Sequence, residues 1–546
     1  MKLARLAALL ALPLAAAAAA QPAQKPKLVV VISVDQFSAD LFAQYRARFD
    51  GGLERLSEGV VFPSGYQGHN ATETCPGHST ILTGSRPART GIIANNWFNL
   101  GLAREDKGVY CSEDPRVAGS SSKGGKYTVS SYHLRVPALG DHMKRSDPRS
   151  RVAVVSGKDR AAIMMGGYRP DQRWWWDHDS KAFVNPGAPA TPKAVAEANS
   201  AVTEALARPR PARDLPKACE SHSRAVPVAG GGKPVGTWRF DREAGDKNLF
   251  RASPDFDRST LDLGEALRRE MKLGEGGSTD LLILGLSGTD YVGHSFGTQG
   301  SEMCIQLLAL DEALGGFFRN LDSTGIDYLV MLTADHGGHD IPERHRDHAA
   351  GDASRVDPAL NAGNMAKSLA SKLKLSGDVL YGDGAFGDMY VDRKLAPAQR
   401  ARVLREAVAT YRRHPQVAAV FTRAELAAAP GPSGSPDGWS LIQRAKASFD
   451  PERSGDFVVM LKPRVTPIFD TGRGYVSTHG SPWDYDRRVP ILFWRKGMTP
   501  FEQSLAVETA DILPTLAAMI GVPIPPGTID GRCLDLDEGP ASTCAP

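Results

Sequence analysis

Five short apolar runs rich in β-branched residues are spread along the chain, and a charged residue follows four of them immediately or after one further residue. Continuous apolar runs of this length are typical of buried strands in a parallel or mixed sheet. Stretches with helical periodicity lie between them, for example 303–321 and 510–520. The runs are KLVVVISV before Asp35, RVAVVSG before Lys158, DLLILGLSG before Asp290, DYLVMLTA before Asp335, and RRVPILFW at 487–494.

This alternation predicts an α/β fold with a central, mostly parallel sheet flanked by helices. In such sheets ligands gather beyond the carboxyl ends of the strands, where the charged residues lie. Two regions interrupt the pattern, at about 168–248 and 430–438. We interpret them as insertions in a single catalytic domain spanning 21–546, because candidate ligands lie on both sides of each. The triple tryptophan at 174–176 is expected to pack inside the first insertion.

The first twenty residues have the pattern of a secretory signal peptide. Lys2 and Arg5 precede an apolar run that ends in small residues, with a predicted cut after Ala20. The run is too short for an anchoring helix, and no later segment is long and apolar enough to span a membrane. We therefore expect a periplasmic or secreted protein. An exported chain can oxidise its cysteines, and the neighbours Cys533 and Cys544 are the first choice for a pair.

Composition narrows the class of partner. The formal net charge of +3 is small for 546 residues, so neither a nucleic acid nor another polyanion is implied. The hydrophobic content of 42% and charged content of 23% are those of a globular protein with a large core. Small molecules are the expected partners.

Carboxylates and imidazoles recur at these strand ends. Asp290 and His294 are four residues apart, which places them on one face of a helix. Asp335 and His336 precede two glycines that make a turn easy. With Asp35 and His479, in a glycine-flanked loop, they give three carboxylates and three imidazoles. This thiolate-free set suits catalytic zinc, and its size suits a two-metal hydrolase site. His339, His345 and His348, by contrast, are expected in a solvated loop as non-ligands.

Further motifs give a resemblance. The segment ATETCPGHSTILTG at 71–84, GIIAN ending at Asn95, DYVGH, ADHG and STHG together resemble the alkaline phosphatase superfamily. Within it, they are most similar to the threonine-nucleophile alkaline phosphatases of the PhoK/PafA type, with nucleotide pyrophosphatase/phosphodiesterases as relatives. The resemblance extends over most of the mature chain. It implies an alkaline-phosphatase-like sandwich with inserted cap segments.

The resemblance also implies roles for individual residues. Thr74 would be the nucleophile and Asn95 would hydrogen-bond a phosphoryl oxygen, with Lys158 and Arg160 as the cationic pair of the monoesterases. Of two zinc ions per chain, one would be held by Asp35, Asp335, His336 and Thr74, and the other by Asp290, His294 and His479. A further calcium ion is possible in principle, but nothing in the sequence supports it.

Threonine and cysteine compete for the role of nucleophile at 74–75. Coordination to zinc lowers the pKa of a hydroxyl and makes an alkoxide available near neutral pH. A thiolate would form a labile phosphothiolate and would oxidise outside the cell. We therefore favour Thr74 and interpret Cys75 as a small buried neighbour. Sulfatases share the fold, but they need at position 74 a residue that can be converted to formylglycine. Threonine cannot be converted in this way, so we do not expect sulfatase activity by that route.

The expected activity is hydrolysis of phosphate monoesters to an alcohol and phosphate through a phosphothreonine intermediate, with a neutral to alkaline optimum. A monoester dianion has a third charged oxygen, which Lys158 and Arg160 could bind. A phosphodiesterase or nucleotide pyrophosphatase with the same metals is the first alternative. An exported protein that binds zinc or phosphate without turnover is the second. The preferred phosphoester, the oligomeric state and the remaining disulfide pairs stay open.

Overall fold

A computed structural model describes residues 25–121, 125, 127–347, 350–539 and 541–544. The predicted signal peptide lies outside the described residues. The core of the fold is a 10-stranded mixed sheet, in which β9, β1, β8, β5 and β6 run parallel to one another. Along one path its strands are β17 (Phe501–Glu502), β2 (Val60–Tyr66), β16 (Arg488–Arg495), β9 (Tyr328–Thr333), β1 (Leu28–Val34), β8 (Asp280–Leu286), β5 (Val152–Ser156), β6 (Gln172–Asp177) and β7 (Ala182–Val184), and β18 (Val507–Glu508) pairs with β2.

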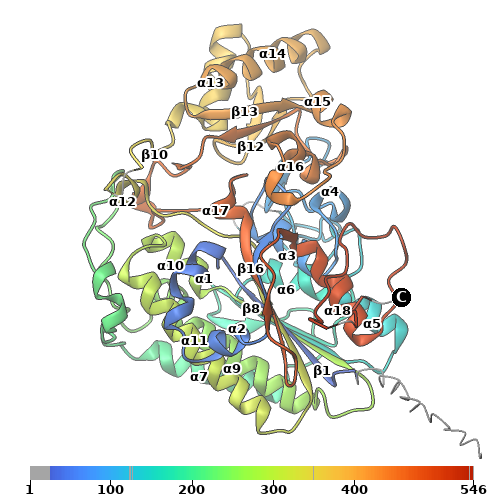
Figure 1. Ribbon diagram of the computed structural model, residues 1–546. Coiled ribbons are helices and arrows are strands. Elements are labelled where there is room, and N and C mark those ends of the chain that lie inside the picture. The colour runs from blue at the N-terminus through green and yellow to red at the C-terminus, as the bar shows by residue number, and fades with distance from the viewer. Residues whose placement is uncertain (1–24, 122–124, 126, 348–349, 540, 545–546) are drawn as a thin grey trace, which may run out of the picture.

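Helices cover both faces of this sheet, so its strands are apolar on both sides (Figure 1). In β1, Val30 and Ile32 join one core cluster while Val29 and Val31 join the other, as the period of two in a strand requires. Helices α1 (Ala39–Tyr45), α2 (Gly52–Ser57), α9 (Pro254–Met271), α10 (Gly288–Phe296) and α11 (Ser301–Asp322) contribute to the first cluster. Helices α3 (Thr74–Ile81), α5 (Leu139–Ser146), α6 (Asp159–Gly166) and α18 (Ile512–Ile520) contribute to the second. The predicted α/β architecture is confirmed.

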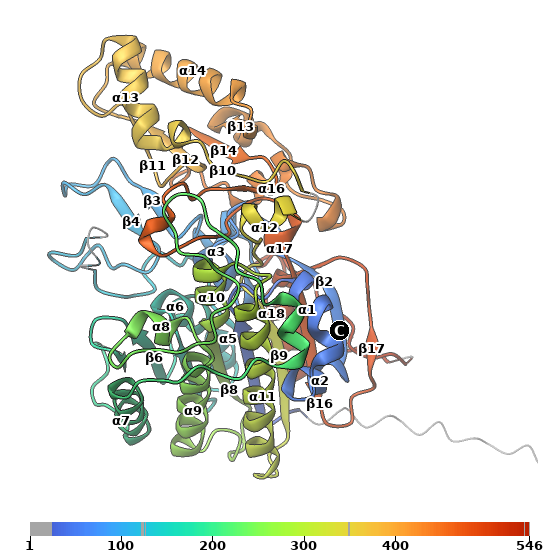
Figure 2. The same ribbon diagram turned by 90° about the vertical axis from the view of Figure 1, so that its left-hand side faces the viewer.

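A second, smaller sheet forms a lobe at one end of the molecule, drawn in yellow and orange at the top of Figures 1 and 2. Its helices pack on the sheet around a separate apolar cluster. The lobe therefore has a core of its own, although the main sheet carries the strand ends of interest. Its strands, in spatial order, are β11 (Leu380–Gly382), β12 (Gly387–Val391), β14 (Phe457–Leu461) and β13 (Val417–Thr422), and its helices are α13 (Ala362–Leu373), α14 (Pro397–Arg413), α15 (Arg423–Ala428) and α16 (Leu441–Ser448).

The predicted insertions take two different forms. Within 168–248, strands β6 and β7 extend the main sheet, helix α7 (Lys193–Ala207) packs on α9, and the segment after it is joined to α11 by the disulfide Cys219–Cys304. Trp174, Trp175 and Trp176 form half of β6 and are buried. Trp174 and Trp176 join one core cluster of the main sheet and Trp175 joins the other, so the triplet packs, but in the main core and not inside the insertion. The second region, 430–438, lies between α15 and α16 of the lobe. The division into one domain with two insertions stays a prediction.

All six cysteines are paired in disulfides. The predicted pair Cys533–Cys544 is confirmed. Cys219 pairs with Cys304, and Cys75 pairs with Cys111. The interpretation of Cys75 as a small buried neighbour is therefore correct for its burial but wrong for its chemistry, since its sulfur is bonded. Among the described residues, no helix has the length and apolar content needed to cross a bilayer.

Candidate active site

The predicted site residues meet at one edge of the main sheet. Asp35 follows β1, Asp335 lies two residues after the end of β9, and Lys158 lies two residues after the end of β5. Asp290 lies in the first turn of α10, which begins just after β8. Because β9, β1, β8 and β5 are adjacent and parallel, their carboxyl ends fall together. Side chains separated by up to 300 positions in the sequence are thus brought to one place.

Thr74 is the first residue of α3, and it lies beside these strand ends with 1% of its surface exposed. Its helix packs very closely on the segment after β9, since a Cβ added to Gly77 would lie 2.0 Å from the carbonyl oxygen of Asp335. Only glycine permits this approach. The TCPGH motif therefore brings the Thr74 hydroxyl to the carboxylates, and Lys158 Nζ donates to Thr74 Oγ1 at 3.4 Å.

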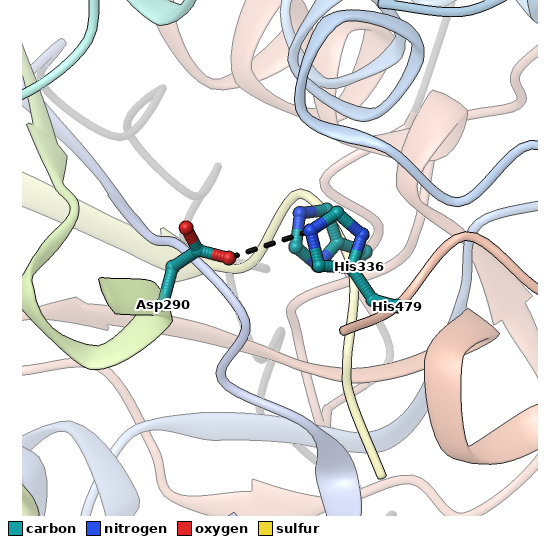
Figure 3. Close-up of side chains that lie close together, drawn as sticks. All are labelled: Asp290, His336 and His479. Carbon is teal, nitrogen blue, oxygen red and sulfur yellow. Dashed lines mark ion pairs between the residues drawn. The ribbon is translucent and has the colours of Figure 1, made fainter. Parts of the chain in front are cut away.

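One group of candidate metal ligands is centred on Asp290. Its Oδ1 lies 3.4 Å from His294 Nε2 and 3.5 Å from His479 Nε2. The ring of His336 stacks on that of His479, with centroids 3.5 Å apart. Asp290 faces this pair of rings (Figure 3). Asp290, His336 and His479 offer ligand atoms that all lie within 4.8 Å of one another.

A second group joins Asp35, Asp335 and His78. His78 Nε2 lies 3.3 Å from Asp35 Oδ1, and His78 Nδ1 lies 3.3 Å from Asp335 Oδ2. His336 borders this group as well, because its Nε2 lies 3.2 Å from the same Asp335 oxygen. The resemblance assigned His336 only to the ion that Asp35 and Asp335 would hold. In the structure it lies between the two groups, since its ring packs on His479.

Three imidazoles have their Nδ1 atoms directed at backbone carbonyls. His294 contacts Ser477 O at 2.9 Å, and His336 contacts Gly337 O at 2.9 Å. His479 contacts Thr72 O at 2.8 Å. A carbonyl only accepts, so each Nδ1 carries a proton, and in the neutral ring it is Nε2 that presents a lone pair. Metal-ligating histidines are oriented by the same kind of outer contact.

Buried polar atoms without a hydrogen-bond partner collect at the same point. A buried acceptor that lacks a partner is costly, and native structures contain few. Cations bound between the two groups would satisfy these atoms, so the residues fit the metal ions that the chemistry of the donor set suggests. The orphaned atoms at the site are Asp35 Oδ1, Asp290 Oδ1, Asp335 Oδ2, His78 Nε2 and His336 Nε2.

Lys158 carries the positive charge at the centre of the site. Its Nζ lies 2.6 Å from Asp290 Oδ2 and 3.0 Å from Asp35 Oδ2, and 1% of its side chain is exposed. Burial lowers the pKa of Lys158, but the two carboxylates more than offset this and hold it above the ordinary lysine value. Conversely, burial raises the pKa of Asp290, while Lys158 and His294 bring it well below the usual range.

Asn95 lies next to the nucleophile helix. Its Oδ1 accepts from the backbone N–H of Cys75 at 2.8 Å, and its own N–H donates to Glu73 at 2.6 Å. Burial raises the pKa of Glu73 to about 7. With Oδ1 occupied, the amide N–H bonds of Asn95 remain available to a ligand.

Arg160 lies in α6, beside the site, and its guanidinium is 4.0 Å from Asp159. Its positive charge lowers the pKa of Lys158 and of Glu73, so it lies within electrostatic reach of both. Its role as the second cation of the clamp stays a prediction.

Sequence reasoning missed His78, which is fully buried against two of the carboxylates. The signal was present, because His78 follows Thr74 by four residues and thus shares its helix face. The solvated-loop expectation was wrong for His339. Its Nε2 contacts Thr466 Oγ1 at 3.0 Å, and the residue is 5% exposed. Thr466 belongs to a separate two-stranded sheet of β10 (Ser354–Arg355) and β15 (Val465–Thr466). His345 is partly buried, and His348 lies outside the described residues.

Comparison with known proteins decides the family. The family model of type I phosphodiesterases / nucleotide pyrophosphatases matches residues 29–482. Alkaline phosphatase PhoK from Sphingomonas sp. is 57% identical over 96% of this chain and 93% of its own length. The chain belongs to the PhoK/PafA-type alkaline phosphatases.

Two further relatives agree with this assignment. Alkaline phosphatase PhoD from Zymomonas mobilis is 47% identical to this phosphatase over 97% of the chain and 92% of its own length. The crystal structure of wild-type alkaline phosphatase PafA superimposes with a TM-score of 0.81 at 26% identity, covering 94% of this chain and 99% of PafA. This alkaline phosphatase therefore has the fold that the sequence predicted.

Proposed function

We propose that this phosphatase is an exported, two-zinc phosphomonoesterase that works through a phosphothreonine at Thr74. The observation that carries the proposal is the position of Thr74 Oγ1, 3.4 Å from Lys158 Nζ at the meeting point of three buried carboxylates. The substrates are small phosphate monoesters, in keeping with the names of the alkaline phosphatase relatives.

The chain would hold the metals through the ligand atoms of its two groups. Asp35, Asp335, His336 and Thr74 are proposed for one ion, and Asp290, His294 and His479 for the other, with His336 able to reach either. Bound zinc supplies Lewis acidity, which lowers the pKa of the Thr74 hydroxyl and neutralises charge on the departing oxygen.

The reaction then has two in-line steps. Thr74 Oγ attacks phosphorus, the bond from phosphorus to the alcohol oxygen breaks, and the alcohol leaves with a proton. Water next attacks the phosphothreonine, the bond from phosphorus to Oγ breaks, and phosphate leaves. Asn95 donates its amide N–H to one phosphoryl oxygen and Lys158 donates its ammonium N–H to another, so that developing charge meets donors already in place.

Monoester preference rests on cations near the third phosphoryl oxygen. Lys158 is buried at the site, and Arg160 adds a second positive charge close enough to lower the pKa of Lys158. A diester carries a carbon group on that oxygen, so it gains less from a charged donor there. The phosphodiesterase reading is favoured by the family match alone.

Export is supported by the leader-like N-terminus together with three disulfides, which persist in oxidising compartments. The periplasm or the medium is the proposed location. Fractionation of cells that produce the full chain, with N-terminal sequencing of the mature protein, tests this. We expect an N-terminus at Gln21.

The decisive experiment for activity compares p-nitrophenyl phosphate with bis-p-nitrophenyl phosphate on the purified, metal-loaded enzyme. We expect the monoester to be turned over with the higher kcat/KM. A preference for the diester would make this chain a phosphodiesterase. Metal binding without turnover of either compound would instead favour a binding protein.

A further inference from the structure

The disulfide Cys75–Cys111 joins the two segments that flank the predicted phosphoryl site. Cys75 directly follows Thr74 in α3, and Cys111 directly follows the strand β4 (Gly108–Tyr110). Strand β4 pairs with β3 (Asn96–Phe98), which begins immediately after Asn95. Both sulfur-bearing residues are fully buried.

Each cysteine also holds Asn95 by a backbone hydrogen bond. The N–H of Cys75 donates to Asn95 Oδ1 at 2.8 Å, and the N–H of Cys111 donates to Asn95 O at 2.9 Å. Asn95 is therefore bound at its side chain by one cysteine and at its main chain by the other. The disulfide closes this arrangement into a covalently linked ring.

From this geometry we infer that Cys75 and Cys111 are positioning residues for catalysis, which fix the Asn95 amide relative to the Thr74 oxygen. The inference rests on the proposed function, in which Asn95 binds a phosphoryl oxygen. Displacements near 1 Å in a positioning contact can lower a rate by about a hundredfold. The disulfide thus positions the Asn95 amide in addition to stabilising α3.

A double-mutant cycle tests the inference with p-nitrophenyl phosphate. Asn95→Ala should lower kcat/KM by about tenfold to a hundredfold, the range of one hydrogen bond to a charged group. The pair Cys75→Ser with Cys111→Ser should lower kcat/KM by about tenfold in the native background, yet by less than about twofold in the Asn95→Ala background. Equal losses in both backgrounds, or no loss in the native one, would overturn the inference.

The matched control is the pair Cys219→Ser with Cys304→Ser. This disulfide joins η3 (Lys217–His222) to α11, neither of which carries a predicted site residue. It should leave kcat/KM within about twofold while lowering the melting temperature. If Asn95→Ala alone has no effect, the proposed role of Asn95 fails rather than that of the disulfide.

Mild reduction provides a second measurement in case the serine variant does not fold. The folded enzyme is treated with tris(2-carboxyethyl)phosphine in water: the phosphine breaks the Cys75–Cys111 bond, one water molecule supplies the two thiol protons, and its oxygen goes to the phosphine oxide. Alkylation and mass spectrometry identify the reduced pair. Activity should fall with that reduction and return on reoxidation, and full activity with both thiols alkylated would contradict the inference.

A separate observation concerns the rim of the site. The ring of Tyr475 stacks on the imidazole of His294, with centroids 4.7 Å and planes 17° apart, and 39% of this tyrosine is exposed. The N–H groups of Val476 and Ser477 both donate to His294 O, so the loop is bound firmly to α10. An aromatic ring with an accessible surface is thereby held beside a candidate metal ligand.

A cation lies close to the same rim. The guanidinium of Arg251, at the end of α8 (Lys247–Arg251), lies 4.1 Å from the centroid of the Tyr291 ring. Its Nε is buried without an acceptor, and no carboxylate pairs with Arg251 in the described part of the chain. Tyr291 precedes His294 by three residues on α10, so the side chain that contacts Arg251 and the one that contacts Tyr475 are neighbours on one face of that helix.

We propose that Tyr475 and Arg251 form a leaving-group subsite for substrates whose leaving group carries a planar ring and a negative charge, such as nucleoside diphosphates, whose terminal phosphoanhydride bond breaks to release a nucleoside monophosphate. This also rests on the proposed function, with the ion proposed for Asp290, His294 and His479 taken as the one next to the departing oxygen. A ring face stacks on Tyr475, and an unpaired guanidinium binds a phosphate oxygen with charge-assisted bonds.

Variants at the two positions separate these contacts. Tyr475→Leu should lower kcat/KM for p-nitrophenyl phosphate and ADP by about fivefold to tenfold, and for glycerol 2-phosphate by less than about twofold, while Tyr475→Phe stays near the native value. Arg251→Met should lower kcat/KM about tenfold for ADP only, and Arg251→Lys should restore part of it. Equal losses on glycerol 2-phosphate would overturn the subsite, with metal content measured in each variant. If the native enzyme turned over none of these substrates, the proposed function would fail instead.

Discussion

The ammonium of Lys158 lies 2.6 Å from Asp290 Oδ2, just past the ends of the adjacent strands β5 and β8. Two buried, oppositely charged groups in contact stabilise each other, and each would be costly without the other. Their contact also places a cation within reach of the Thr74 hydroxyl. The residue proposed to bind phosphate is thus built into the charge balance of the site.

Removing the cations should distinguish monoesters from diesters. Lys158→Ala with Arg160→Ala is expected to lower kcat/KM for p-nitrophenyl phosphate by about a hundredfold or more, since charge-assisted hydrogen bonds to phosphate are lost. The loss for bis-p-nitrophenyl phosphate should be at least about tenfold smaller. Lys233→Ala, at an exposed lysine, is the matched control. An equal loss on both substrates would refute the clamp.

The nucleophile can be tested by direct observation of the intermediate. Thr74→Ala should lower kcat by about a thousandfold or more, whereas Thr74→Ser should retain much of it because the hydroxyl remains. Acid quenching during turnover, followed by mass spectrometry, should find phosphate on the peptide that contains residue 74. Thr203→Ala, at an exposed position in α7 (Lys193–Ala207), should leave turnover unchanged. Turnover that survives Thr74→Ala would assign the attack to another group.

Metal analysis tests the ligand set independently of activity. We expect about two zinc ions per chain, because two-metal sites place the ions on both sides of the reacting group. Asp290→Asn and Asp335→Asn should each lower the metal content measured by mass spectrometry, and chelation should abolish turnover until zinc is restored. Asp241→Asn, at an exposed aspartate, should retain the native content. Native metal content in both site variants would show that the ions bind elsewhere.

Asp257 should make stability depend on pH. It is 1% exposed, it accepts from Gly288 N at 2.7 Å and from Gln306 Nε2 at 2.9 Å, and burial raises its pKa from 3.8 to about 7. A raised carboxyl pKa means that the native state binds the proton more tightly than the unfolded state. The free energy of unfolding therefore falls as pH rises from about 4 to 7, by up to roughly 4 kcal/mol from this group.

Asp257→Asn removes this titration without removing the side-chain oxygen that accepts from Gly288. Thermal unfolding of both proteins at pH 5 and pH 8.5 gives the measurement. The melting temperature of the variant relative to the native protein should increase between the two values. An unchanged difference would mean that Asp257 has an ordinary pKa in the folded protein.

Local patterning was sufficient for several features of the site. The apolar runs before Asp35, Asp290 and Asp335 became the parallel strands β1, β8 and β9, because strands buried on both faces need continuous apolar sequence. The four-residue spacing of Asp290 and His294 became a contact at 3.4 Å on α10, as helix geometry dictates. Asp335 and His336 lie after the end of β9, where a turn frees both side chains.

Other features had no local signal. The strands of the lobe are short, and β11, β13 and the start of β12 are only partly buried. Their sequences therefore contain no continuous apolar run from which these strands could be predicted. His339 is buried by Thr466, which is 127 positions away in the sequence. Cys75 could have paired with any other cysteine, and only the packing of α3 against the β3–β4 hairpin selects Cys111.

The sequence by itself determined which residues end the strands and which share a helix face, since both follow from short-range backbone geometry. Only the tertiary structure decided that His336 packs on His479 between the two ligand groups, and that Cys75, Cys111 and Asn95 form one linked unit. Contacts of that kind depend on how distant segments bury their apolar faces against each other. Periodicity within a segment carries no information about that arrangement.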